Sequence, residues 1–156
     1  MNKIYAVIGM CGSGKSEAVK IFLSHGYKRV YFGDVVMNEL KKNSLEVNEQ
    51  NERLMRERLR SDFGMGAMAV KSLDKIINLY KTDNVVIESL YSWDEYKIIN
   101  KEFPNIFKLV TTFTSKEIRY QRLSVREGRP LTKSEAISRD ISEIENLDKG
   151  GPIAFT

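Results

Sequence analysis

With 156 residues, 42% of them hydrophobic and 29% charged, the chain has the size and composition of one globular domain with a hydrophobic core. No apolar run approaches the roughly 20 residues that a membrane-spanning helix needs, the N-terminus leads into a predicted strand without a signal peptide, and the single cysteine allows no internal disulfide, so we expect a cytoplasmic protein without a membrane partner. The net charge is +4, and the positive charge is concentrated in arginine clusters that could bind either phosphate ligands or nucleic acid. No segment alternates aromatic with basic residues as single-strand-binding proteins do, so we expect no nucleic-acid partner.

The first predicted elements are a strand, a glycine-rich loop and a helix. Residues 4–8 form an apolar, β-branched run typical of a buried strand, and residues 17–23 repeat apolar side chains at helical spacing. Between them, Gly9-Met10-Cys11-Gly12-Ser13-Gly14-Lys15-Ser16 fits the phosphate-loop pattern G-x-x-x-x-G-K-[ST] at every fixed position. A glycine-rich turn that binds nothing would explain the glycines, but not the lysine and the serine in their required places.

The residue types of this loop indicate how it would bind ATP. Glycines allow backbone conformations in which successive N–H groups point at phosphate oxygens, and the start of the helix adds unpaired N–H donors. Lys15 would bring a charge to the β- and γ-phosphates, and the Ser16 hydroxyl is placed for Mg²⁺. We expect the ATP phosphates to be bound by Gly9, Gly12, Ser13, Gly14, Lys15 and Ser16.

An acidic residue follows the second predicted strand. The first helix is expected to end near His25-Gly26, and residues 28–32 read as a strand that runs directly into Gly33-Asp34. An acid just beyond the carboxyl end of a strand lies where ligands bind in open α/β sheets. Asp34 is therefore a candidate site residue, and it could also be the N-cap of the next helix.

Residues 35–80 are predicted to be helical, with short breaks. A helix over residues 47–61 carries Arg56 and Arg60 four positions apart, on one face. These arginines could bind an anionic ligand, or they could lie on a solvated face where Glu52 and Glu57 are their partners. The apolar side of the same helix is expected to comprise Leu54, Met55 and Leu59.

The clearest later strand spans residues 84–88 and ends in Glu88. Its unbroken apolar run suits a central strand that is covered on both faces. Carboxylates are rare at the end of a buried strand, and in phosphate-loop proteins an acid there contacts Mg²⁺ directly or through water, so Glu88 is a candidate metal-site residue. Ser92 and Glu95 then predict a capping box at the start of the next helix.

The last third of the chain contributes a strand, two helices and more arginines. Residues 106–113 read as a strand, and the helix after it carries Arg122 and Arg126 on one face. A charged, turn-rich segment separates this helix from a last helix over residues 133–149, which contains Arg139.

The whole chain resembles the P-loop kinases of the nucleoside monophosphate kinase group, and most of all the small archaeal adenylate-kinase-related and dephospho-CoA-kinase-like nucleotide kinases. The phosphate loop alone fits many ATPases and GTPases. The narrower resemblance rests on Phe32-Gly33-Asp34, the arginine-rich helix that leads into residues 62–69, the strand that ends in Glu88, and Arg122, Arg126 and Arg139-Asp140.

This resemblance implies an α/β P-loop NTPase fold of three α/β/α layers in a single domain over residues 1–156, with a parallel sheet of strand order 2-3-1-4-5. The core would comprise residues 1–34, 81–122 and 139–156, with a helical acceptor-binding insertion at 35–80 and a lid at 123–138. The chain stops about where a family member would enter its fifth strand, so we do not expect that strand and its helix here.

Residue roles follow from the resemblance where this sequence matches the family's motifs. Ser16 would bind Mg²⁺, with Asp34 and Glu88 acting through water, and Arg122 would pack against the ATP adenine. The residues implied in catalysis are Lys15, Asp34, Arg126 and Arg139. The residues implied in binding the phosphoryl acceptor are Gly33, Asp34, Val35, Arg56, Arg60 and Glu88.

Two departures from the family concern the acceptor. Adenylate kinases have an arginine three residues after the Gly-Asp pair, where this sequence has Met37, and another shortly after the acid of strand 3, where this sequence reads Glu88-Ser89-Leu90-Tyr91-Ser92. Both arginines hold the AMP phosphate in those kinases. Either Arg56 and Arg60 replace them, or the acceptor is not AMP.

Three functions are compatible with the sequence. The first, which we expect, is an ATP- and Mg²⁺-dependent transfer of the γ-phosphoryl group to a nucleoside monophosphate such as AMP, or to a similar small acceptor. The second is a nucleotide-binding ATPase or switch whose only acceptor is water; the absent acceptor arginines favour it and the lid-type arginines oppose it. The third, a nucleic-acid-binding protein that uses ATP, rests mainly on net charge. No N-K-x-D motif supports a GTPase.

Overall fold

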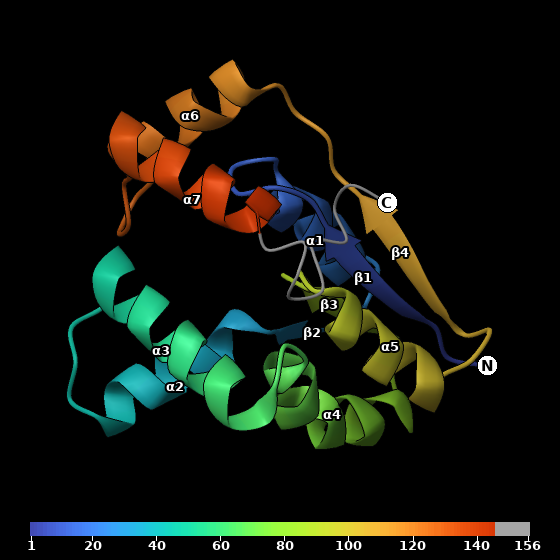
Figure 1. Ribbon diagram of the computed structural model, residues 1–156. Helices are drawn as coiled ribbons and strands as arrows, with labels where there is room; N and C mark the ends of the chain where they lie inside the picture. Colours follow the sequence, from blue (N-terminus) through green and yellow to red (C-terminus); the bar gives the residue numbers. More distant parts are fainter. Residues whose placement is uncertain (146–156) are drawn as a thin grey trace.

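The computed structural model describes residues 1–145 as a parallel β-sheet with helices on both faces (Figure 1). The strands are β1 (Ile4–Ile8), β2 (Lys28–Tyr31), β3 (Val85–Glu88) and β4 (Phe107–Thr111). They are hydrogen-bonded in the order β2-β3-β1-β4, and all three pairings are parallel. The order predicted for the first four strands is confirmed, and the position of a fifth strand lies outside the described residues.

Within residues 1–145 the sheet is accompanied by seven helices. The helix α1 (Lys15–Ser24) joins β1 to β2, and three helices, α2 (Gly33–Lys42), α3 (Glu49–Phe63) and α4 (Ala67–Tyr80), join β2 to β3. The helix α5 (Trp93–Glu102) joins β3 to β4, and α6 (Lys116–Ser124) and α7 (Lys133–Glu145) follow β4. The predicted capping box is present at the start of α5, where the side chains of Ser92 and Glu95 each accept a hydrogen bond from the other's backbone N–H. The helical character predicted for residues 35–80 is also confirmed.

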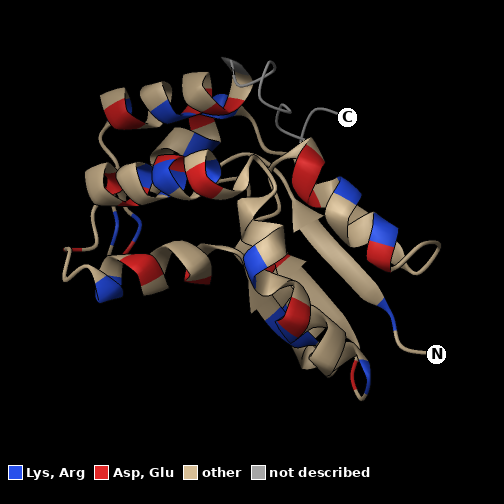
Figure 2. Cartoon of the chain, turned by 60° about the horizontal axis from the view of Figure 1, so that its bottom comes forward, with Lys and Arg blue, Asp and Glu red and all other residues tan. Residues whose placement is uncertain are grey.

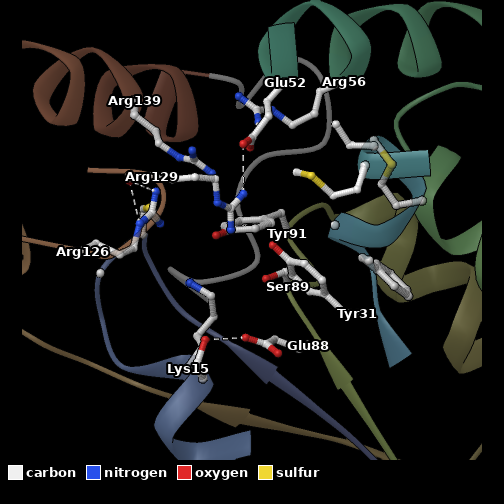
Figure 3. Close-up of a pocket in the computed structure, with 18 of the residues that line it drawn as sticks. Lys15, Tyr31, Glu52, Arg56, Glu88, Ser89, Tyr91, Arg126, Arg129 and Arg139 are labelled. Carbon is white, nitrogen blue, oxygen red and sulfur yellow. Dashed lines mark hydrogen bonds and ion pairs between the residues drawn. The ribbon is translucent and has the colours of Figure 1, made fainter. Parts of the chain in front are cut away.

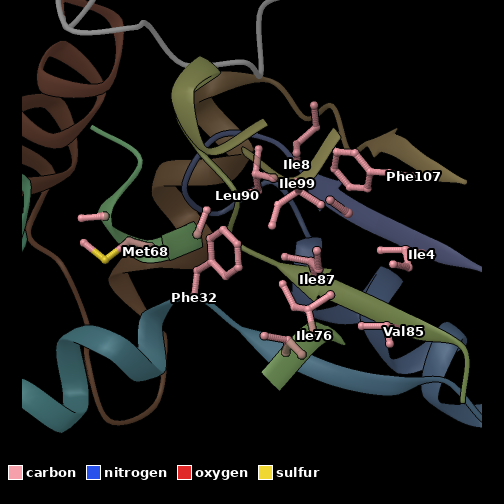
Figure 4. Close-up of a cluster of buried hydrophobic side chains, with 14 of the residues drawn as sticks. Ile4, Ile8, Phe32, Met68, Ile76, Val85, Ile87, Leu90, Ile99 and Phe107 are labelled. Carbon is pink, nitrogen blue, oxygen red and sulfur yellow. The ribbon is translucent and has the colours of Figure 1, made fainter. Parts of the chain in front are cut away.

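The hydrophobic core follows the alternation of side chains along the two central strands. Ile4 and Ile87 are fully buried on one face of the sheet, in a cluster with apolar side chains of α4 and α5 (Figure 4). Val7 and Val86 point to the other face, where they pack with Val19 of α1. Because successive side chains of a strand point to opposite faces, these apolar runs need helices on both sides. All four strands then end at the same edge of the sheet, where the loops after them meet.

Three predictions of local structure were wrong. The helix α6 ends at Ser124, with Val125 as its C-cap, so Arg126 lies beyond the helix and shares no helix face with Arg122. The N-cap of α2 is Phe32 rather than Asp34, which lies in the first turn of the helix. Leu54 is 53% exposed, and the buried face of α3 instead comprises Glu52, Met55 and Leu59. The end expected for α7 near residue 149 lies outside the described residues.

Candidate functional site

The phosphate loop lies between the end of β1 and the start of α1. Gly12 has a φ of 80°, and a Cβ at this position would approach the backbone oxygen of Arg119 to 2.9 Å, so only glycine fits. The Lys15 Nζ donates hydrogen bonds to the carbonyl oxygens of Gly9 (2.8 Å) and Met10 (2.9 Å), and the side chain is buried within its own loop. This burial lowers the pKa of the Lys15 ammonium group, because the charged form is less well solvated.

A buried ion pair holds the phosphate loop against α6 and α7. The guanidinium group of Arg119 donates to both carboxylate oxygens of Asp140, at 2.8 and 2.6 Å, and also to the carbonyl oxygen of Cys11, at 3.0 Å. Tyr120 donates its hydroxyl proton to the same carboxylate at 3.1 Å. Bidentate arginine–carboxylate pairs fix both partners in one orientation. The position of Cys11 in the loop is therefore tied to two helices far along the chain.

Ser16 and Glu88 meet at the carboxyl edge of the sheet. The Ser16 Oγ donates a hydrogen bond of 2.7 Å to the Glu88 Oε1, and the Arg29 Nε donates one of 2.6 Å to the Glu88 Oε2. The Glu88 residue is only 3% exposed, so the Arg29 pair compensates its negative charge. A hydroxyl and a carboxylate side by side are hard oxygen ligands of the kind that Mg²⁺ takes together with phosphate and water. The residues at this position therefore fit a magnesium ion.

These groups open into a first cavity of about 420 Å³, which also receives side chains from α3, α6, α7 and the 125–132 turn (Figure 3). Of the residues that the sequence predicted for a site, those that line this cavity are Gly12, Gly14, Lys15, Ser16, Gly33, Arg56, Arg60, Glu88, Arg122, Arg126 and Arg139. The predicted residues that do not line it are Gly9, Ser13, Asp34 and Val35. Ser13 is buried behind the loop, where its hydroxyl is hydrogen-bonded to that of Thr112 at 2.8 Å.

The side chain of Asp34 points away from the phosphate loop. It is 52% exposed, and the Lys75 Nζ on α4 lies 3.9 Å from its Oδ2. The reason is that α2 begins at Gly33, directly after β2, so Gly33 faces the cavity and the next side chain is rotated onto the outer surface of the helix. The structure therefore brings Glu88, but not Asp34, to the Ser16 hydroxyl.

Three arginines of the first cavity are paired with acidic side chains of α3. Arg129 donates to the Glu52 Oε1 at 3.0 Å (Figure 3). Arg139 donates to the Glu49 Oε2 at 2.7 Å. Arg56 donates to the other oxygen of Glu49 at 2.8 Å. These contacts join α3 to α7 and to the turn before it. The cavity therefore holds a network of alternating charges that fixes the orientation of these three guanidinium groups.

Arg126 and Arg122 lie at different parts of the same cavity. Arg126 donates through its Nε and Nη2 to the backbone oxygen of Arg129, at 2.8 and 2.6 Å, which closes the turn after α6. The Arg122 Nη1 lies 3.4 Å from the carbonyl oxygen of Gly12 and 3.4 Å from the Thr114 hydroxyl, on the exposed side of the phosphate loop.

Tyr91 lines the cavity and lies in the segment after Glu88, where adenylate kinases have one of the two arginines that this sequence lacks. Ser89 before it adopts a left-handed φ of 67°, which sharply redirects the chain after β3. The Tyr91 ring centre lies 5.2 Å from the Lys15 Nζ, and burial raises the pKa of the phenol well above its usual value. Met37, at the other missing-arginine position, also lines the cavity. The sequence signalled these two residues only as departures from a pattern.

Four further residues of the site were not predicted as site residues: Arg29, Glu49, Arg129 and Glu143. Arg29, Glu49 and Arg129 have partners on other elements, so local spacing did not identify them, although Arg129 falls within the charged turn that was expected to belong to a lid. Glu143 lies four residues after its partner Arg139 on α7, and this helical spacing was the one signal that could have identified it. Basic and acidic segments are interspersed along the helices (Figure 2). No helix within residues 1–145 has the length and apolar character required to cross a bilayer.

Comparisons with known proteins agree with this architecture. The family model of the AAA domain matches residues 6–146. A UPF0200 protein of Methanosarcina mazei is 34% identical over 147 residues, which cover 94% of this chain and 73% of that protein. The UPF0200 protein TK1334 of Thermococcus kodakarensis is 37% identical over 158 residues, with 97% of this chain and 84% of that protein covered.

Solved structures show the same fold at lower sequence identity. The crystal structure of TT1252 from Thermus thermophilus matches with a TM-score of 0.61 and 16% identity, over 95% of this chain and 83% of that one. The shikimate kinase of Bacteroides thetaiotaomicron matches with a TM-score of 0.55 and 14% identity, over 94% of this chain and 81% of that one. The predicted α/β P-loop kinase fold is thereby confirmed, while the resemblance to adenylate kinases in particular stays a prediction.

Proposed function

From the premise that the chain belongs to the AAA-domain and UPF0200 families, we propose that it is a kinase that transfers the γ-phosphoryl group of ATP to a nucleoside monophosphate or a similar small acceptor. One observation carries the proposal. A single cavity joins the phosphate loop and the Ser16–Glu88 pair to arginines from three separate parts of the chain. Phosphoryl transfer is accelerated mainly by positioning and by neutralising charge, which is what such an assembly supplies.

The roles of the residues follow from their places in the cavity. Ser16 and Glu88 would hold Mg²⁺, which neutralises phosphate charge when it is bound. The Lys15 ammonium group would exchange its two carbonyl acceptors for phosphate oxygens, and Arg126 and Arg139 would neutralise the oxygens of the group in transfer. Asp34 has no role in this proposal, because it is exposed and lies outside the cavity.

The remaining parts of the chain would bind the two substrates. We assign the acceptor to the insertion at residues 35–80, where Arg56 and Arg60 would replace the arginines that are absent at Met37 and after Glu88. Segment 123–138 would act as the lid that excludes water during transfer. Arg122, on the exposed side of the phosphate loop, would pack against the adenine of ATP.

The test is an incubation with Mg·ATP alone and then with AMP, other nucleoside monophosphates or dephospho-CoA, with products resolved by chromatography. We expect a phosphorylated acceptor to form faster than free phosphate. Lys15→Ala should lower this rate by about a hundredfold or more, whereas Lys20→Ala, an exposed lysine on the same helix, should leave it within twofold. Free phosphate released at one rate with and without every acceptor would replace the kinase with an ATPase or switch. A loss of less than about tenfold in Lys15→Ala would reject the site.

A further inference from the structure

A second cavity, of about 1010 Å³, lies between α3 and α7 beside the first. The two cavities share Arg56, Arg60, Tyr91 and Arg139, so a ligand in the second would lie next to the phosphate loop. Ligand pockets of small-molecule enzymes are usually of this size and carry a few polar groups that fix the ligand's orientation. The polar atoms of this cavity that have no hydrogen-bond partner therefore indicate which ligand the cavity could bind.

Arg60 on α3 has a donor without an acceptor. Its Nε is buried and finds no hydrogen-bond partner within residues 1–145. By contrast, Arg56 and Arg139 both donate to Glu49. A buried N–H of a charged group that lacks an acceptor is costly, because it has lost its water without compensation. An anionic oxygen of a ligand would supply the missing acceptor.

Glu143 on α7 has an acceptor without a donor. Its Oε1 accepts from the Arg139 Nε at 3.3 Å, while its Oε2 is buried and has no partner in the described part of the chain. Ser138 and Ser142, whose hydroxyl groups can donate or accept, lie on the same wall. A ligand hydroxyl would satisfy the Glu143 Oε2, whereas a bare anion would be repelled by it.

The two orphaned atoms select one kind of ligand. An anion without a hydroxyl satisfies Arg60 but not Glu143, and a neutral polyol can hydrogen-bond to both but leaves the guanidinium charge without an anion. Among the described residues that line this cavity, Met65 is the only aliphatic side chain and Tyr91 the only aromatic one, so no pair of apolar faces is available to enclose a base.

We propose that the second cavity binds an acceptor that is a hydroxyl-bearing anion, such as a sugar phosphate or a hydroxy acid. Arg60 would bind the anionic group and Glu143 a hydroxyl, and no pair of apolar faces would enclose a base. This inference rests on the proposed kinase function and names the chemistry of its acceptor.

Binding can be measured calorimetrically with the full chain, after the first cavity is filled with Mg²⁺ and a non-hydrolysable ATP analogue. The probes are ribose 5-phosphate, gluconate, ribose, inorganic phosphate and AMP. We expect ribose 5-phosphate or gluconate to bind at least about tenfold more tightly than ribose and inorganic phosphate, and which of the two binds distinguishes a phosphate from a carboxylate anion. AMP should bind no more than about threefold more tightly than ribose 5-phosphate, since the base adds no contact.

Two variants with matched controls locate the site. Arg60→Met and Glu143→Gln should each weaken binding of the better probe by about tenfold or more. Arg60→Met leaves the anionic group unpaired, and Glu143→Gln replaces a charged hydrogen-bond acceptor with a weaker, neutral one. Arg58→Met, exposed on the same helix as Arg60, and Glu117→Gln, exposed on α6, should leave it within twofold. Both control residues lie outside the two cavities. Circular dichroism and melting temperature confirm that each variant is folded.

Three results would overturn the inference: neither anion binds, Arg60→Met and Glu143→Gln bind like the parent protein, or AMP binds more than about tenfold better than ribose 5-phosphate. Binding that depends on Arg60 and Glu143, without phosphoryl transfer from Mg·ATP, would uphold this site and reject the kinase function. Phosphoryl transfer to an acceptor at a rate that neither variant changes would uphold the kinase function and reject this site.

Discussion

Removal of the Asp140 carboxylate tests how the phosphate loop is held in place. Arg119 and Asp140 are 6% and 4% exposed, and the carboxylate accepts two bonds from the guanidinium group and one from the Tyr120 hydroxyl. Asp140→Ala leaves the guanidinium charge buried without compensation, and breaking a buried pair in this way costs about 3–5 kcal/mol. Tyr120→Phe removes one hydrogen bond and should cost about 1 kcal/mol.

Equilibrium unfolding in urea, followed by circular dichroism, measures these losses in the free energy of unfolding. The control is Glu57→Ala, which breaks a pair with Arg53 in which both side chains are more than half exposed and should cost about 0.5 kcal/mol or less. If Asp140→Ala proves too unstable to purify, the Tyr120→Phe value still tests the network. A loss below about 1 kcal/mol for Asp140→Ala would refute the argument that this pair is a structural anchor of the loop.

The remaining predictions concern the metal site, a buried acid and the adenine. Glu88→Gln should lower kcat with Mg·ATP by about a hundredfold and Asp34→Asn should leave it within twofold; the reverse order would return the metal role to Asp34. Burial raises the pKa of Glu95, so the stability that this group contributes is present at low pH and is lost as the pH rises through its folded pKa. The variant Glu95→Gln keeps the capping box, and its melting temperature should fall less between pH 4 and pH 8 than that of the parent protein. An equal fall in the two proteins would contradict this argument. Arg122→Ala should raise the KM for ATP about tenfold at a similar kcat, as expected for uniform binding, and an unchanged KM would remove its assignment to the adenine.

Features that depend only on residues close together in the sequence could be predicted. The phosphate loop needs glycine at fixed positions and a lysine and a serine at the start of a helix, and each requirement is met within eight consecutive residues. The apolar runs of residues 4–8 and 84–88 similarly predicted central strands, because both faces of a covered parallel sheet must be apolar. The capping box formed by Ser92 and Glu95 spans only four residues, and it too was predicted correctly.

Asp34 and Glu88 were both predicted as site residues, but only the side chain of Glu88 reaches the Ser16 hydroxyl. Both acids were expected at the carboxyl ends of neighbouring strands, where ligands bind in open α/β sheets, so the same argument applied to both. Glu88 is still part of β3, and its side chain is fixed by the alternation of the strand toward Ser16. Asp34 comes one residue after α2 has begun, and the rotation of about 100° per helical residue turns it toward Lys75. A shift of one residue in the start of a helix decides which acid reaches the site, and such a boundary is not encoded by spacing alone.

Helical spacing predicted Glu52 as a partner of Arg56, and the two lie 3.6 Å apart, but the partners that join different elements could not be predicted, because they lie far apart in the sequence. Arg129 and Glu52 are separated by 77 positions, and Arg139 and Glu49 by 90, whereas helical spacing proposes only partners three or four residues away. Helical spacing alone gave Arg56 and Arg60 the same expected role, because both lie on one face of the same helix. In the folded chain Glu49 takes a donor of Arg56, while the buried Nε of Arg60 finds no acceptor among residues 1–145. Whether an arginine can receive an anion depends on which acids of other elements have already engaged its donors, and that property is set by the tertiary fold.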